Sequence, residues 1–142
     1  MTPTASGATA AQTATDVINF PDGLLGFPDC HSFVLSATSH DGLFWLQSTE
    51  YEPLAFLLVD PFRHFESYCV ELSDIEVARL HADRPADVAI LATVTLGRDG
   101  ATANLQGPIA LNIARGCARQ VIIGDPKFGV RMPLELPDLV GN

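Results

Sequence analysis

Basic side chains are scarce in this chain of 142 residues, which has eight lysines and arginines against seventeen aspartates and glutamates and a net charge of −9. The first basic residue is Arg63, and seven acidic residues precede it. Nucleic acids and anionic membranes are bound through lysine and arginine, which neutralise phosphate groups. The composition therefore argues against both as direct ligands. It favours a basic protein partner, and acidity for solubility alone is the alternative.

Cysteines and long apolar runs are also few. The three cysteines, Cys30, Cys69 and Cys117, are too widely spaced for a disulfide framework or a C-x-x-C metal motif, which indicates reduced thiols in a reducing compartment. The longest strongly apolar run covers residues 54–59, far short of the roughly 20 residues of a membrane-spanning helix. The amino terminus has no lysine or arginine, so no signal peptide is expected. We expect a cytoplasmic protein without a membrane partner.

Catalytic signatures are missing from the sequence as well. It contains no G-x-S-x-G, P-loop, G-x-G-x-x-G or H-E-x-x-H pattern. His64 and Cys69 lie five residues apart with Asp60 nearby, but catalysis needs an oriented base beside the thiolate and zinc needs three or four converging ligands. The sequence predicts no enzyme, no metal and no cofactor. A ligand-binding or enzymatic barrel with His64 or Cys69 at its rim is the competing hypothesis.

The residues that are present predict one mainly β domain. Residues 1–15 are mostly Ala, Thr, Ser, Gly and Gln, which cannot bury a core, so we expect a disordered tail before a domain at 16–142. Residues 88–95 are apolar on both faces, as in a strand buried on both sides or built into a barrel. Turn signals lie at 21–23, 41–42, 99–100 and 115–116. The expected strands are 17–20, 33–37, 43–47, 54–60, 88–95, 102–105, 109–113, 120–123 and 130–134.

One segment between the predicted strands has the pattern of a helix. Ser73 and Glu76 have the capping-box spacing, in which the serine caps a helix and the glutamate reaches back to the cap residue. Apolar residues follow, and Pro85 prevents the chain from continuing as a helix. We expect one short helix of two to three turns. Eight or nine short strands with a single helix predict a compact antiparallel β-barrel-like domain.

Aromatic residues gather in residues 61–68. Phe62 and Phe65 are expected to plug the open end of the barrel. Tyr68 lies between Glu66 and Glu71, and it is the best candidate for an exposed interface anchor, because aromatic side chains on loops are frequent binding hot spots.

A second stretch with candidate binding residues covers residues 102–109, where Asn104 and Gln106 lie close to Gly107-Pro108. These side chains can shape the end of a strand by hydrogen bonds to the main chain. Equally, a polar strand edge here can receive a partner segment by β-augmentation. The candidate partner-binding residues of the whole chain are Gln47, Glu50, Glu66, Tyr68, Glu71, Asn104 and Gln106.

Several short motifs follow one another along the chain in a recognisable order. They are Phe20-Pro-Asp-Gly-Leu24 with Gly26-Phe27, Phe44-Trp-Leu-Gln-Ser48, Pro53-Leu-Ala-Phe56, Asp60-Pro61, Tyr68, Thr93-Val-Thr95, Thr102-Ala-Asn-Leu105, Pro108-Ile109, Asn112 and Gln120-Val121. Each motif is weak by itself. Together, in this order and spacing, they resemble the FliW family of bacterial flagellar assembly factors over nearly everything after the tail.

The resemblance implies a small β-barrel-like fold without catalytic activity. It also implies that the protein binds newly made flagellin and, alternatively, the translational regulator CsrA in cells that contain CsrA. In that family CsrA represses translation of the flagellin message, and FliW relieves the repression until accumulating flagellin sequesters FliW. An acidic protein suits this role, because an RNA-binding regulator must have a basic surface.

Overall fold

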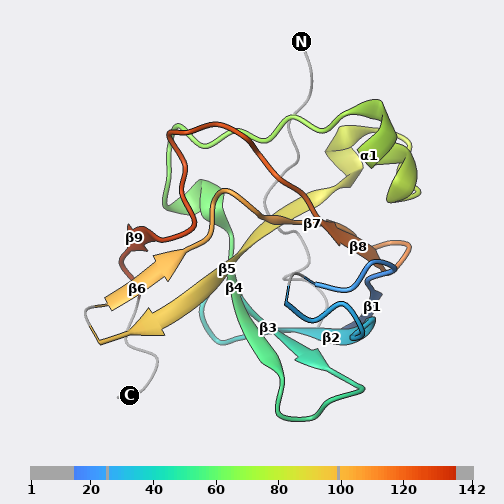
Figure 1. Cartoon of the computed structure of the whole chain (residues 1–142), viewed down its shortest axis with the longest axis horizontal. Coiled ribbons are helices and arrows are strands. Elements are labelled where there is room, and N and C mark those ends of the chain that lie inside the picture. The colour runs from blue at the N-terminus through green and yellow to red at the C-terminus, as the bar shows by residue number, and fades with distance from the viewer. Residues whose placement is uncertain (1–14, 25, 99, 137–142) are drawn as a thin grey trace.

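The computed structural model describes residues 15–24, 26–98 and 100–136, and these ranges form a strand-rich domain (Figure 1). One α-helix, α1 (Asp74–Arg79), and two 3-10 helices, η2 (Pro61–Arg63) and η3 (Pro85–Asp87), accompany the strands in this part of the chain. The strands are β1 (Thr15–Asn19), β2 (Ser32–Ala37), β3 (Leu43–Ser48), β4 (Ala55–Val59), β5 (Ala89–Gly97), β6 (Gly100–Ala103), β7 (Ile109–Asn112), β8 (Cys117–Gln120) and β9 (Met132–Leu134).

Seven strands close a barrel in the order β4-β3-β2-β1-β8-β7-β5, because β5 pairs with β7 through Ala89–Leu91 and with β4 through Ala92–Val94. Strands β6 and β9 extend the sheet from the far end of β5. The ladders are antiparallel except at the junction of β1 and β8, where Asn19 pairs in parallel with Cys117. The predicted β-barrel-like fold is confirmed, and a short parallel contact completes its closure.

The apolar residues form two cores, one on each side of the barrel wall. The inner core contains Ile18, Phe20, Leu24, Phe33, Leu35, Phe44, Leu46, Leu58, Leu91, Ile109, Leu111 and Ala118. The outer core lies beneath the chain that connects β4 to β5, and includes Val59, Tyr68, Val70, Leu72, Val77, Leu80, Ile90, Ala92, Leu105, Val121 and Phe128. Strand β5 contributes to both cores, which confirms its predicted burial on two faces and explains why its residues are apolar in sequence.

The hairpins follow their turn signals. Strands β2 and β3 pair across the Asp41-Gly42 turn, and β7 and β8 pair across Arg115-Gly116. The turn after β1 requires Gly23, whose φ is +69° and where an added Cβ would lie 2.5 Å from the Pro28 carbonyl oxygen. The strand predicted at 120–123 lies earlier in the chain, because β8 covers Cys117–Gln120 and residues 121–123 follow its end.

The helix is shorter than predicted, with six residues instead of two to three turns. Ser73 caps it as expected, since its hydroxyl accepts a hydrogen bond from the Glu76 N–H at 3.1 Å. The Glu76 carboxylate does not reach back to the cap. It instead accepts a bond from Arg119 Nε at 3.2 Å, and Arg119 also pairs with Asp22. A long-range ion pair therefore replaces half of the local capping box and ties α1 to β8.

Phe62 and Phe65 do not plug the barrel. Both are half-buried and pack against the outer core, because the chain after β4 folds back along the outside of the barrel wall. The expected tail at 1–15 falls largely on residues outside the described ranges, and its last residue, Thr15, begins β1. Among the described residues, no helix is both long and apolar enough to cross a membrane.

Candidate functional site

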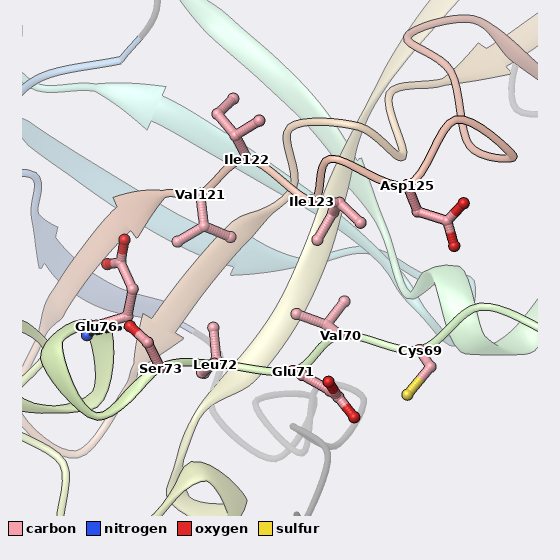
Figure 2. A pocket seen from close by; sticks show the side chains of 10 residues that line it. All are labelled: Cys69, Val70, Glu71, Leu72, Ser73, Glu76, Val121, Ile122, Ile123 and Asp125. Atoms are coloured by element: carbon pink, nitrogen blue, oxygen red, sulfur yellow. Dashed lines mark hydrogen bonds between the residues drawn. The ribbon is translucent and has the colours of Figure 1, made fainter.

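Two neighbouring hollows share one lining residue, Ile122. The larger, of about 520 Å³, lies between the segment that leads into α1 and the segment that follows β8. We call it the acidic groove, and Figure 2 shows these two segments running past each other with Val70 and Leu72 directed toward Val121 and Ile123. Its lining residues are Cys69, Val70, Glu71, Leu72, Ser73, Glu76, Val121, Ile122, Ile123 and Asp125.

The charge of the acidic groove is negative, since three of its lining residues are acidic and none is Lys, Arg or His. Arg119 offsets the charge of Glu76. Within the described ranges, the Asp125 carboxylate accepts a hydrogen bond only from the Lys127 main-chain N–H, at 2.9 Å. Glu71 is exposed and has no hydrogen bond or ion pair within the described part of the chain. Two carboxylates are thus available to a cationic partner.

The smaller hollow, of about 310 Å³, has a more apolar lining and no charged residue. We call it the amide pocket, because asparagine and glutamine side chains meet there with aliphatic and aromatic ones. Ile122 and Val130 remain 66% and 59% exposed at its edge, which leaves two large apolar side chains in solvent. The lining residues are Leu24, Phe56, Thr93, Asn104, Gln106, Gly107, Gln120, Ile122 and Val130.

Asn104 combines a structural role with a free donor. Its Oδ1 accepts a hydrogen bond from the Gly107 N–H at 2.9 Å, which shapes the turn after β6. Its Nδ2 has no hydrogen-bond partner among residues 15–24, 26–98 and 100–136. This amide is half-buried in the lining of the pocket and can donate to a carbonyl group of a bound protein.

The Gln106 side chain holds the loop after β8 by hydrogen bonds to its main chain. Its Nε2 donates hydrogen bonds to the carbonyls of Asp125 (3.1 Å) and Phe128 (2.5 Å), and its Oε1 accepts one from the Gly124 N–H at 2.6 Å. The side chain therefore holds the loop that contributes Asp125 to the acidic groove. Of the two roles considered for this stretch, main-chain hydrogen bonding describes Gln106.

Tyr68 is buried, contrary to the expectation of an exposed anchor, with 5% of its surface accessible. Its hydroxyl donates a hydrogen bond to the Leu105 carbonyl at 2.7 Å, and its ring meets Phe128 edge-on with centroids 4.9 Å apart. Burial raises the pKa of the phenol well above its ordinary value. Local sequence does not reveal this burial, because Leu105 and Phe128, which contact Tyr68, are distant from it in the chain.

Gln47 and Glu50 lie outside both hollows, around the loop between β3 and β4. Gln47 Nε2 donates to the carbonyls of Glu52 and Leu54, at 2.6 and 3.0 Å. Glu50 Oε1 accepts from the main-chain N–H groups of His31 and Ser32, at 2.6 and 2.9 Å. These bonds give both residues an internal structural role, and a contact with a partner stays a prediction.

The Glu50 contacts predict a pH-dependent contribution to stability. The N–H groups of Ser32 and then His31 hold the pKa of this carboxyl below its ordinary value of 4.5. A depressed folded-state pKa stabilises the protein above the unfolded-state pKa, and this contribution is lost as pH falls through the folded-state value. Glu50→Gln should therefore be less stable than the parent chain at neutral pH, and the difference should shrink at about pH 3. Urea denaturation at both pH values tests this, with exposed Glu52→Gln as the matched control.

The two remaining candidates, Glu66 and Glu71, are exposed on the segment before α1. The structure brings Glu71 together with Asn104 and Gln106, since their hollows adjoin at Ile122. Ile122 and Asp125 were missed by the sequence reasoning. The run 121–123 is uniformly β-branched and apolar, so nothing in it distinguishes the exposed middle residue from its two neighbours.

The competing catalytic hypothesis receives no geometric support. His64 is not among the residues that line the acidic groove with Cys69, and both residues are exposed. Within the described ranges, no group of three or more His, Cys, Asp or Glu side chains could hold a metal ion.

Comparisons with known proteins agree with this architecture. Residues 2–134 match the family model described as FliW protein. A flagellar assembly factor FliW from Geobacter sulfurreducens is 36% identical over 135 residues, covering 94% of this chain and 84% of the relative. Another from Natranaerobius thermophilus is 34% identical over 122 residues, covering 83% and 81%. The crystal structure of a flagellar assembly factor FliW superposes with a TM-score of 0.76 at 31% identity, covering 88% of this chain and 89% of that one.

Proposed function

This chain belongs to the FliW family of flagellar assembly factors, and on that basis we propose that it binds flagellin in the cytoplasm and, alternatively, binds and antagonises CsrA. The protein would thereby couple flagellin synthesis to flagellar assembly without catalysing a reaction. Family membership over nearly the whole described chain is the observation that supports this proposal most strongly.

The proposed switch needs only two partners whose footprints overlap. When flagellin accumulates before export, it occupies the protein and leaves CsrA free to repress the flagellin message. When flagellin is exported, the protein is released and can bind CsrA. The partner with the higher free concentration relative to its dissociation constant occupies more of the protein, so no conformational change is required.

The surface described above is suited to protein partners. The net charge of −9 steers the protein toward a basic regulator and away from nucleic acid. Exposed Ile122 and Val130 add apolar contact area beside the unpaired Nδ2 of Asn104. An apolar centre with a few oriented polar groups is typical of protein interfaces.

The direct test is size-exclusion chromatography of the purified chain mixed with monomeric flagellin at micromolar concentration. We expect a stoichiometric complex that elutes earlier than either protein. Separate elution of the two proteins at that concentration would contradict the proposed function. Repeating the run with CsrA tests the second partner, whose complex should weaken as the salt concentration rises, because part of its attraction is electrostatic.

Asn104→Asp tests whether the amide pocket contacts a partner. The substitution keeps Oδ1 for the Gly107 N–H but replaces the free donor Nδ2 with an acceptor. If a partner carbonyl accepts from Nδ2, binding should weaken roughly tenfold, since an unmatched acceptor in an interface costs about 1–3 kcal/mol. Calorimetric titration of flagellin measures the change. Exposed Asn19→Asp adds the same charge outside both hollows and should bind like the parent chain.

A further inference from the structure

Residues 69–72 form an extended edge to which no strand of the described part of the chain is paired. Exposure alternates along 69–73, with Cys69, Glu71 and Ser73 exposed and Val70 and Leu72 buried, which is the two-residue period of an extended chain. The main-chain N–H and C=O groups of 69–72 have no hydrogen-bond partner among the described residues. The edge is nevertheless held in place, because Val70 and Leu72 are 0% and 7% exposed in the outer core.

The opposite border of the acidic groove also presents unpaired main chain. The N–H groups of Val121 and Ile123 donate to the carbonyls of Pro108 and Gln106, at 2.9 and 2.8 Å. Successive N–H groups of an extended chain point to opposite sides, so the Ile122 N–H points away from these carbonyls. It has no partner in the described part of the chain, and Ile122 lines the groove. Figure 2 shows this segment running past the 69–72 edge.

Unpaired main chain beside a hollow is the feature that strand-adding domains use to bind extended peptides. Main-chain hydrogen bonds give such a complex its affinity, and alternate side chains give it specificity. In the acidic groove, the carboxylates of Glu71 and Asp125 can select basic side chains of a bound peptide. Among the residues that the structure describes, Glu71 has no ion pair, and the Asp125 carboxylate accepts a hydrogen bond from the Lys127 N–H alone.

We propose that the acidic groove binds an extended segment of a partner protein, added as a strand along residues 69–72, with lysine or arginine at alternate positions facing Glu71 and Asp125. Side chains two residues apart lie on one face of a strand, so two basic residues with one residue between them can face the groove together. The inference rests on the proposed function, because the segment belongs to a protein partner of this chain.

Hydrogen exchange of the full-length protein tests the added strand. The probe is an alternating lysine–threonine peptide of about ten residues, the upper end of common strand lengths. Amides 69–72 should exchange rapidly in the free protein, and saturating peptide should slow them about tenfold or more, because pairing protects main-chain N–H groups. A glutamate–threonine peptide and an N-methylated lysine–threonine peptide are the controls. Equal protection by either control, or no protection by the probe, would overturn the proposal.

Charge reversal supplies the matched variant. Glu71→Lys should abolish protection by the probe. Asp83→Lys reverses the charge in the same way at an exposed loop position outside the groove, and this variant should retain the protection. Equal protection in both variants would overturn the role of Glu71. Thermal melts of both variants confirm folding, which the exposed Glu71 side chain should not affect.

The flagellin chromatography reports on the proposed function separately. Probe-dependent protection without a flagellin or CsrA complex would contradict the proposed function and leave the groove established. A flagellin or CsrA complex without any probe protection would contradict the groove alone.

Discussion

Tyr68→Ala should lower the free energy of unfolding by about 3–5 kcal/mol, the usual cost of removing a large buried aromatic side chain. The ring is 5% exposed and packs against Phe62 and Phe128, so its removal leaves a cavity in the outer core. The Leu105 carbonyl also loses its hydrogen-bond donor. Tyr68→Phe keeps the ring and should cost about 1 kcal/mol. Urea denaturation followed by circular dichroism measures both changes.

The matched control is Tyr51→Ala, because Tyr51 is the same residue type with 55% of its surface exposed. It should change stability by no more than about 0.5 kcal/mol. If Tyr68→Ala instead left stability unchanged and weakened flagellin binding, Tyr68 would be an interface residue and the buried placement would be wrong.

Gln106→Ala is expected to have the next largest effect, lowering the free energy of unfolding by about 2–3 kcal/mol at roughly 1 kcal/mol for each of its side-chain hydrogen bonds. Those bonds fix Gly124, Asp125 and Phe128. Because these bonds hold a surface loop, the amide hydrogen of Gly124 should also exchange faster in the variant than in the parent chain. Chemical denaturation and hydrogen exchange measure the two effects.

Glu66→Ala is the control for Gln106→Ala, since the Glu66 side chain is exposed and has no hydrogen bond within the described ranges. It should be neutral in both measurements. An unchanged Gly124 exchange rate in Gln106→Ala would show that the loop is held by its main chain alone.

The contrast between Tyr68 and β5 shows where sequence reasoning succeeds. The apolar character of 88–95 on both faces is a local pattern, and it correctly predicted a strand buried on both sides. Tyr68 has polar neighbours in sequence, so the same reasoning placed it in solvent. Its burial depends on Leu105 and Phe128, which are distant in the chain and contact it only through the tertiary fold.

The candidate site was predicted in part for the same reason. Glu71 is a candidate in the sequence as a neighbour of Tyr68, and Asn104 as a polar residue beside Gly107-Pro108; both line hollows in the structure. Their proximity through Ile122 depends on where the segment after β8 leaves the ladder. Register at a strand end is set by long-range pairing, which the run 121–123 does not reveal.

We propose that this small protein binds flagellin and CsrA in turn. A preformed complex of this chain with CsrA, titrated with monomeric flagellin and followed by native mass spectrometry, tests it most directly. We expect CsrA to be released in proportion to the flagellin bound, with no species that contains all three proteins. A stable ternary complex, or retention of CsrA at saturating flagellin, would contradict it.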